Sequence, residues 1–301
     1  MRTSGPAPRA LLTGATGFIG SHLLGHLRTS GWEVAVLARP AAAAMLSQQF
    51  AASRVYSYGG STAEVLEVLG EYRPGVVFHL SSHFLATHDS TQIESLVSSN
   101  ILLGTQLLEA MRVAGVTCLV NAGTSWQNYA GAAYNPVNLY AATKQAFEDI
   151  VGYYTQTAGL RAVTLRLYDS YGERDERRKL LRLLLDSLRT GEPLGMSPGD
   201  QVLDLVHVDD ICRAFLRAAE LAMEMPVGAR IYAVSSGERR SLKQVVATLE
   251  EAAGRKIAIQ FGARPYRDRE VMVPWVGPPL PGWVPEISLL EGLKRLISEQ
   301  V

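Results

Sequence analysis

The chain has 301 residues, of which 47% are apolar, and its 29 Lys and Arg balance 29 Asp and Glu. This length supports one large domain or two closely packed ones, which excludes a small scaffold held together by disulfides. The formal net charge of zero removes the bulk attraction that dominates non-specific nucleic-acid binding, so we expect a small-molecule partner and no nucleic acid.

The two cysteines and the lack of long apolar runs indicate the compartment. Cys118 lies in an apolar run and Cys212 in a helical pattern, which favours two buried thiols over a disulfide or a metal site. No run reaches the ~20 apolar residues of a membrane-spanning helix, and residues 1–9 lack the apolar core of a signal peptide. We therefore expect a cytoplasmic protein with no membrane partner and no metal.

From residue 10 onward, short apolar runs alternate with amphipathic stretches, the pattern of strand–helix–strand units that wind a parallel sheet. Helices cover both faces of such a sheet, so its strands are continuous apolar runs, as in residues 76–80. The predicted strands are residues 10–12, 33–37, 54–58, 75–80, 117–122 and 162–167. The predicted helices are residues 19–30, 63–69, 91–114 and 137–157.

The composition of the sequence changes after residue 167. A charged run at 173–179 precedes a leucine-rich helix at 180–189, and residues 265–285 are dense in Pro, Trp and Arg. We predict an α/β fold: a doubly wound parallel sheet (Rossmann) in residues 1–167, and a smaller C-terminal substrate-binding lobe in residues 168–301. The lobe would cover the carboxyl edge of the sheet, where such sheets bind ligands, and residues 204–234 would return to the first unit.

Residues 13–20 (TGATGFIG) follow the first predicted strand and open the first helix. Glycines allow a tight turn and close approach to a pyrophosphate, and the helix N-terminus offers free N–H groups to that anion. Glycines also serve any tight turn, but the position at the first strand–helix junction favours a dinucleotide. The candidate cofactor residues in this turn are Gly14, Thr16, Gly17, Phe18 and Ile19.

The second predicted strand ends in Val36-Leu37-Ala38-Arg39-Pro40, where NAD-binding proteins place a carboxylate for the ribose 2′-OH. A cation at Arg39 matches a 2′-phosphate, and no acid is there to repel it. The sequence therefore predicts that NADP(H) is preferred, with NAD(H) as an alternative. The competing interpretation is that Arg39 is a solvated arginine at a strand end with no role in cofactor binding.

Tyr140 and Lys144 lie four residues apart at the start of a helical pattern, which places both on one helix face. A nearby ammonium, together with the positive nicotinamide of a cofactor, favours the phenolate, so we expect the two charges to lower the pKa of Tyr140 for acid and base work. Thr124, after the fifth predicted strand, could hydrogen-bond a substrate carbonyl or alcohol. Together with the glycine turn, these three residues are the candidate catalytic set.

At this point the chain resembles the extended short-chain dehydrogenase/reductases, the NAD-dependent epimerase/dehydratase branch that acts on nucleotide sugars. The motifs that carry the resemblance are residues 13–20, 79–82 (HLSS), Asn100 with Gly104, the Thr124, Tyr140 and Lys144 set, 166–172 (RLYDSYG), 204–210 (DLVHVDD), 282–285 (GWVP) and Gly292. Residues 123–127 (GTSWQ), 134–140 (YNPVNLY) and 168–172 (YDSYG) more narrowly resemble reductases of nucleotide-linked 4-keto-6-deoxyhexoses, of the CDP-abequose and CDP-paratose synthase type.

The resemblance implies further site residues. Leu80, Ser81, Ser82 and Leu167 would contact the cofactor, and Asp169, Lys179 and Leu180 would lie near the pyrophosphate or base of the nucleotide sugar. His83, Ser125 and Trp126 would border the sugar, although core packing explains His83 and Trp126 equally well. Family members often carry an Arg before the acid at 204 to grip the diphosphate, whereas this chain has Leu203; Arg264, Arg267 or Arg269 could substitute, or be solvated surface residues.

The resemblance also narrows the reaction. Family dehydratases carry an Asp-Glu pair after the catalytic Thr, and here Ser125-Trp126 cannot exchange protons near neutral pH, which disfavours dehydration. We therefore expect an NADPH-dependent 4-ketoreductase of deoxysugar biosynthesis. A nucleotide-sugar epimerase with tightly held NAD and a non-catalytic NADP-binding regulator stay open. The helices at 91–114 and 137–157 would pair in a homodimer through a four-helix interface, as in relatives.

Overall fold

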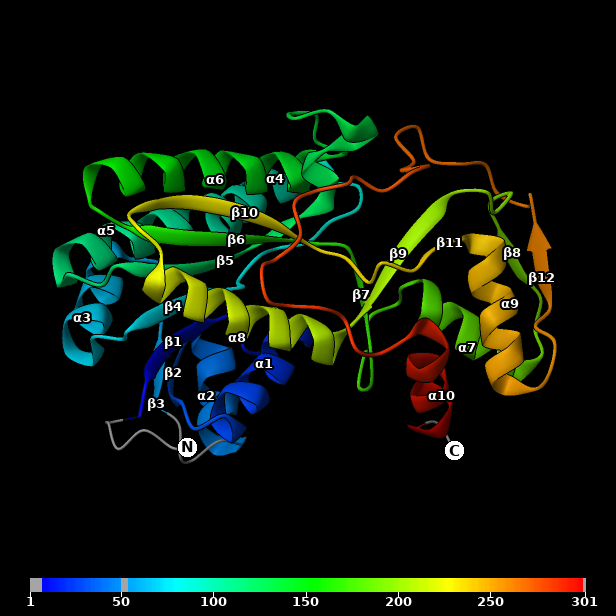
Figure 1. The fold of residues 1–301 in the computed structure, drawn as a ribbon, viewed down its shortest axis with the longest axis horizontal. Helices are drawn as coiled ribbons and strands as arrows, with labels where there is room; N and C mark the ends of the chain where they lie inside the picture. The colour runs from blue at the N-terminus through cyan, green and yellow to red at the C-terminus, as the bar shows by residue number, and fades with distance from the viewer. Residues whose placement is uncertain (1–6, 50–53, 300–301) are drawn as a thin grey trace.

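The structure, a computed structural model, describes residues 7–49 and 54–299. Within them, seven strands form one parallel sheet in the order β10-β6-β5-β4-β1-β2-β3 (Figure 1). The chain starts in the middle of this sheet at β1, builds outward to β3, and then crosses to β4 on the other side of β1. This is the predicted doubly wound α/β architecture, which is confirmed. The strands are β1 (Arg9–Thr13), β2 (Glu33–Ala38), β3 (Arg54–Ser57), β4 (Val76–His79), β5 (Cys118–Thr124), β6 (Arg161–Leu167) and β10 (Gly228–Val234).

Helices cover both faces of the sheet, which is why β4 and β5 are buried along their whole length. One face packs against α1 (Phe18–Thr29), α2 (Pro40–Gln49) and α8 (Val208–Glu224). The other packs against α3 (Thr62–Tyr72), α5 (Leu103–Ala114) and α6 (Leu139–Thr157). Figure 1 shows the two groups of helices on opposite sides of the strands.

A smaller group of elements follows β6, beyond the carboxyl ends of the strands (Figure 1). A third cluster of buried apolar residues, separate from the two beside the main sheet, holds it together. Its elements are β7 (Asp169–Tyr171), α7 (Leu180–Thr190), β8 (Leu194–Met196), β9 (Val202–His207), β11 (Arg239–Ser241), α9 (Leu242–Ala253), β12 (Ile259–Phe261) and α10 (Leu289–Glu299). β9 pairs with β7 and β11 in a small sheet, whereas α8 and β10 lie on the main one. The unit boundary at residue 167 stays a prediction.

The helix predicted at 91–114 is confirmed, although it is not α-helical throughout. After a short turn at Ser90–Gln92, α4 (Ile93–Val97) is followed by a π-helical segment, Ser98–Leu102, before α5 begins. Single π turns insert an extra residue and often occur at functional sites. Here the turn carries the buried Asn100, whose hydrogen bonds to other segments are described below.

The carboxyl end of β10, the last strand at one edge of the sheet, pairs with the proline-rich segment that leads to α10. Ala233 donates its N–H to the carbonyl oxygen of Pro278 at 2.8 Å and forms an isolated bridge with Pro279. Both cysteines are free and buried, as predicted. In residues 7–49 and 54–299, we find no helix long and apolar enough to cross a membrane.

Candidate functional site

The glycine turn between β1 and α1 is shaped for close approach. Gly14 has a φ of +79°, which favours glycine. A Cβ built at Gly20 would lie 2.0 Å from the carbonyl oxygen of Gly14, so only a glycine at position 20 lets this oxygen come so close to α1. Gly17 caps α1 without a side-chain hydrogen bond, and Thr16 and Gly17 are exposed. The first N–H groups of α1 therefore have no side-chain cap, which fits a pyrophosphate.

The loop after β4 is tied to this turn. Thr13 Oγ1 accepts the N–H of Ser81 at 3.2 Å and lies 2.9 Å from Nδ1 of His79, in a shared hydrogen bond. A Cβ on Gly14 would come within 2.7 Å of the Leu80 carbonyl carbon, so the two loops touch through their backbones. Burial, with the Lys144 charge, lowers the pKa of His79 to about 3, so its ring is neutral. The predicted residues Leu80, Ser81 and Ser82 thus lie beside the glycine turn.

The end of β2 presents Arg39 to solvent. Its side chain is exposed and has no partner among the residues that the structure describes. Its carbonyl oxygen accepts the N–H of Ala43 at 2.8 Å, which places it at the start of α2, whose first residue is Pro40. A free guanidinium beside a helix N-terminus offers two favourable features to a phosphate group.

Tyr140 and Lys144 lie on the first turns of α6, which Asn138 caps by accepting the N–H of Ala141 at 2.9 Å. Lys144 is 2% exposed, and burial lowers its pKa to about 8. Burial also raises the pKa of Tyr140 to about 12, against an opposing effect of Ser82. The predicted lowering of this pKa by Lys144 together with a bound nicotinamide stays a prediction, because it concerns the protein with its cofactor. Tyr140 is protonated at neutral pH and can donate a proton.

Asn100 joins the loop after β4 to the helix that carries Tyr140. Its Oδ1 accepts the N–H of His83 at 2.7 Å, and its Nδ2 donates to the His83 carbonyl at 3.1 Å and to Thr143 Oγ1 at 2.9 Å. Thr143 in turn donates to the carbonyl of Tyr140 at 2.7 Å. The backbone of His83 is thus fixed beside the start of α6, and the π turn is what directs Asn100 inward.

Thr124 ends β5 and caps the short turn that follows it. Its Oγ1 accepts the N–H of Trp126 at 3.3 Å, so its own hydroxyl proton stays available to a ligand. The backbone N–H of Thr124 donates to Gln127 Oε1 at 2.9 Å. Ser125 and Trp126 are half-buried in this turn.

Phe84 is a site residue that the sequence analysis missed. Its ring is 44% exposed and lies 5.0 Å from that of Tyr140 and 5.7 Å from that of Trp126, measured between centroids. Lys179 Nζ lies 5.2 Å from the centre of the same ring. Phe84, Trp126 and Tyr140 therefore form an aromatic wall, with a cation at its border.

Charged residues from the second group of elements gather around Asp169. Burial raises the pKa of Asp169, while Lys179 and Arg267 act to lower it. Lys179 caps α7, and Leu180 is the first residue of that helix. Arg267 is 65% exposed, with a distant contact of 3.9 Å to Glu270. The two cations and the helix start can together receive an anion.

Arg269 forms hydrogen bonds with the loop that precedes α6. Its Nη2 donates to Asn135 Oδ1 at 2.6 Å and to the Pro136 carbonyl at 3.0 Å, and its Nε donates to the Val137 carbonyl at 3.1 Å. The guanidinium also stacks over Tyr129 at 4.3 Å. These bonds tie the tail to the loop before α6 and engage Nε and Nη2 of Arg269, so we propose Arg267 ahead of Arg269 as a ligand of the diphosphate.

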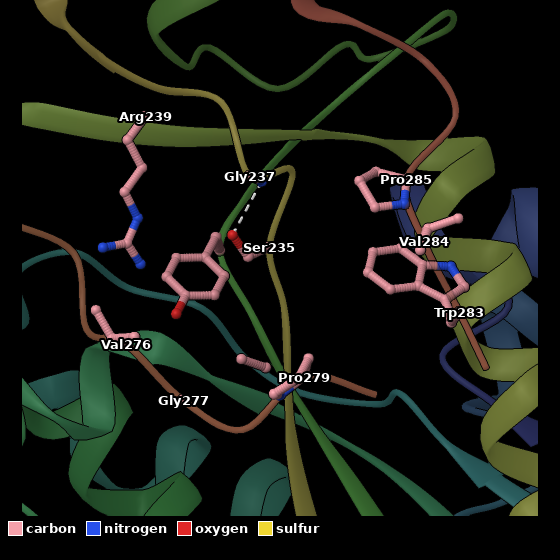
Figure 2. A pocket seen from close by; sticks show the side chains of 11 residues that line it. Ser235, Gly237, Arg239, Val276, Gly277, Pro279, Trp283, Val284 and Pro285 are labelled. Carbon is pink, nitrogen blue, oxygen red and sulfur yellow. Dashed lines mark hydrogen bonds between the residues drawn. The ribbon is translucent and has the colours of Figure 1, made fainter. Parts of the chain in front are cut away.

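A cavity of about 300 Å³ lies where the chain after β10 meets the proline-rich segment that leads to α10 (Figure 2). It is lined by Tyr168, Ala233, Ser235, Gly237, Arg239, Val276, Gly277, Pro279, Trp283, Val284 and Pro285. Tyr168 stands between the predicted cofactor residue Leu167, at the end of β6, and Asp169. The predicted catalytic residues do not line this cavity, so it is a feature separate from their site.

Glu173, His207 and Asp209 come together at the start of α8, which the sequence did not indicate, and such residue types can hold a metal. His207 Nδ1 accepts the N–H of Asp209 at 3.2 Å, so the ring proton is on Nε2, which lies 3.1 Å from Glu173. His26 Nε2 lies 2.9 Å from Asp209 and Arg295 3.8 Å from it. These contacts describe a charge cluster that joins α1, α8 and α10, and we assign it no metal.

The chain is similar to known proteins along nearly its whole length. Residues 10–234 match the NAD dependent epimerase/dehydratase family. The CDP-abequose synthase of Salmonella typhimurium is 26% identical over 96% of this chain and 97% of its own length. The UDP-glucose 4-epimerase of Mycolicibacterium smegmatis is 25% identical, with the same coverage. The solved structure of MoeE5 in complex with UDP-glucuronic acid and NAD superposes with a TM-score of 0.80 at 26% identity, covering 97% of this chain and 98% of the MoeE5 chain.

Proposed function

Because the chain belongs to the NAD dependent epimerase/dehydratase family, we propose that it is an NADPH-dependent reductase of the C4 ketone of a nucleotide-linked 4-keto-6-deoxyhexose. The observation that carries the choice of reductase is Arg39, unpaired at the end of β2 among the described residues, with no carboxylate in its place. A reductase exchanges its cofactor each turnover, and Arg39 suits the 2′-phosphate of NADPH. The similarity to CDP-abequose synthases along nearly the whole chain supports the deoxysugar.

The residues around the glycine turn fit the cofactor. The first N–H groups of α1 would take the pyrophosphate, Arg39 the 2′-phosphate, and the loop at residues 80–82 with Leu167 would border the rest. Bound NADPH supplies a hydride from its nicotinamide ring, and reduction adds this hydride to the carbonyl carbon and one proton to the carbonyl oxygen.

The proton comes from Tyr140. Its raised pKa keeps the hydroxyl protonated at neutral pH, as an acid in carbonyl reduction must be, whereas an enzyme that begins by oxidising an alcohol needs the phenolate. Thr124 donates its free hydroxyl hydrogen to the developing alkoxide. Lys144, buried one turn after Tyr140 on α6, would orient the nicotinamide ribose.

The aromatic wall supports a 6-deoxy sugar as the proposed substrate. Phe84 and Trp126 present apolar ring faces next to Tyr140, and such a surface favours a methyl group over a hydroxymethyl group, whose hydroxyl would lose its water partners there. Ser125 and His83 flank this wall on the same two loops. Lys179, Leu180 and Arg267, around Asp169, would hold the diphosphate and part of the nucleotide.

A nucleotide-sugar 4-epimerase is the second candidate, because UDP-glucose 4-epimerases match the chain over the same length. It would retain NAD through each turnover and change the sugar without net oxidation. A non-catalytic NADP-binding regulator is the third, and the presence of both Tyr140 and Lys144 counts against it.

One assay separates the three candidates. Purified protein is mixed with NADPH and a CDP-, dTDP- or UDP-linked 4-keto-6-deoxyhexose, and absorbance at ~340 nm follows the loss of NADPH. A reductase consumes NADPH in proportion to the hydroxyl formed, and Tyr140→Phe removes at least ~99% of the rate. If the protein binds NADPH but reduces none of these sugars, the proposal fails. If the purified protein contains bound NAD and isomerises UDP-glucose, it is an epimerase. If Tyr140→Phe leaves its activity unchanged, the non-catalytic regulator is favoured.

We also propose a homodimer through α4, α5 and α6. More than 40% of each of five apolar side chains is exposed here, and burying them would be favourable: Ile93 and Val97 on α4, Leu102 in the π-helical segment, Val113 on α5 and Tyr153 on α6. A second copy of the chain would pair the helices and cover them. Val97→Glu should convert the dimer to a monomer in light scattering after size exclusion, and a wild type that is monomeric at micromolar concentration would exclude the interface.

A further inference from the structure

An ion pair is buried beneath the candidate catalytic residues. Arg166 on β6 and Glu148 on α6 have side chains only 6% and 5% exposed, and their Nη2 and Oε2 atoms are 2.5 Å apart. Arg166 Nε also donates to Glu148 Oε1 at 3.3 Å. Removing two charges from water is costly, and apolar replacements of such pairs are often neutral or stabilising. Stability alone therefore does not explain why this pair is present.

The pair is connected to Thr124 through one glutamine. Gln127 Nε2 donates to Glu148 Oε1 at 2.8 Å, and Gln127 Oε1 accepts the backbone N–H of Thr124 at 2.9 Å. On the other side, Arg166 Nη2 donates to Gln145 Oε1 at 3.1 Å, and its Nη1 donates to Asn128 Oδ1. The polar atoms of the pair are thus used within the network, so a shift of Glu148 would also displace the turn that presents the Thr124 hydroxyl.

Glu148 also acts along its own helix. Tyr140, Lys144 and Glu148 follow one another at intervals of four residues on α6, so they share one helix face. The Glu148 charge raises the pKa of Lys144, against the lowering effect of burial. The groups that face Lys144 are Tyr140 and Glu148 on α6 and the neutral His79 on β4, with Arg166 on β6 behind Glu148. Glu148 is therefore the negative charge that acts directly on this ammonium.

We propose that Glu148 is a positioning residue with two connections: through Gln127 it fixes the turn that carries Thr124, and through its charge it keeps the Lys144 ammonium charged beside Tyr140. Arg166 anchors the carboxylate so that both connections start from one fixed point. The importance of this arrangement for catalysis rests on the proposed reductase, whereas its effect on Lys144 is a property of the protein alone.

The test measures Lys144 directly. In protein labelled with ¹³C at the lysine ε-carbon, the Lys144 signal is assigned with Lys144→Met and followed by NMR as the pH is raised. Glu148→Gln keeps the shape and removes the charge, so the Lys144 titration should move to lower pH by about one unit or more. In the reductase assay, the alkaline fall of kcat should move by a similar amount, with the KM for NADPH changed less than kcat.

The matched control is Asp149→Asn, which removes the same charge from the next residue of α6, an exposed one, and should leave the Lys144 titration in place. If Glu148→Gln does not fold, Glu148→Gln with Arg166→Gln removes both charges and should again lower the pKa of Lys144. An unmoved titration in a folded variant, or an equal movement in Asp149→Asn, overturns the proposal. A shifted titration in a protein without reductase activity would instead refute only the proposed function.

Discussion

Arg39 offers a direct measure of cofactor choice. If it pairs with the 2′-phosphate of NADP(H), Arg39→Ala should weaken NADPH binding and leave NADH binding nearly unchanged, because NADH has no phosphate there. A guanidinium about 4 Å from a phosphate of charge near −2 gains about 2 kcal/mol in water before screening. Screening by salt at about 0.15 M weakens this electrostatic attraction, and charge-assisted hydrogen bonds to the phosphate add a similar amount of binding free energy. We therefore expect a loss of about 2 kcal/mol, or about thirty-fold in Kd.

Titration of the fluorescence of NADPH and NADH, each with wild type and variant, gives the four dissociation constants. Arg255→Ala is the matched control, since it removes an exposed arginine just after α9. The thirty-fold effect should shrink as salt is raised, because the pair is exposed to solvent. Arg39→Asp should reverse the preference by offering a carboxylate to the ribose 2′-OH. A ratio of NADPH to NADH affinity that Arg39→Ala does not change would refute the reasoning.

Three further predictions concern packing, specificity and acid stability. Gly104→Ala would place a Cβ 2.3 Å from an aromatic ring of α6 and should lower the free energy of unfolding in urea by about 1–3 kcal/mol, whereas Gly152→Ala, with open space around it, should not. Phe84→Ala should lower kcat/KM for the 6-deoxy sugar by about tenfold or more, and kcat/KM for a 6-hydroxy analogue by less. Equal losses of kcat/KM for the two sugars would contradict the role of the aromatic wall. The hydrogen bond with His26 lowers the pKa of Asp209 to about 2, so Asp209→Asn should cost about 1–2 kcal/mol of unfolding free energy at pH 7. This contribution is present above the unfolded pKa of about 4 and is lost as pH falls through about 2, so the two proteins should converge in acid.

The parallel sheet and the glycine turn could be predicted because their signals are local. Residues 13–20 need their glycines whatever surrounds them, and Gly14 and Gly20 indeed sit where a Cβ would collide with backbone. The apolar runs of the buried strands are equally local, since both faces of such a strand are covered. The position of Tyr140 and Lys144 on one helix face follows from their spacing of four residues, whereas their catalytic role stays a proposal.

Other parts of the site depend on contacts between distant segments. Phe84 meets Tyr140 and Trp126 only because the ends of β4, β5 and the start of α6 converge, and nothing in the local sequence marks it. The π turn at Asn100 leaves the apolar pattern of its helix nearly unchanged, so the pattern predicts one continuous helix. The pKa of Tyr140 depends on how deeply the phenol is buried, which spacing does not reveal. Arg267 and Arg269 look alike in sequence, and only the fold shows that Arg269 is engaged by backbone carbonyls.

The proline-rich cover on β10 also has a consequence for solubility. An uncovered strand at the edge of a sheet offers a row of unpaired N–H and C=O groups on which another molecule can add a strand. Pro278 and Pro279 lie along this edge and have no N–H of their own, so the segment that pairs with Ala233 cannot itself extend the sheet. Deleting the segment would uncover the buried carboxyl end of β10, at Ala233 and Val234, and so lengthen the edge that is open to intermolecular pairing. The chain would then tend to aggregate even if its catalytic residues were correctly placed.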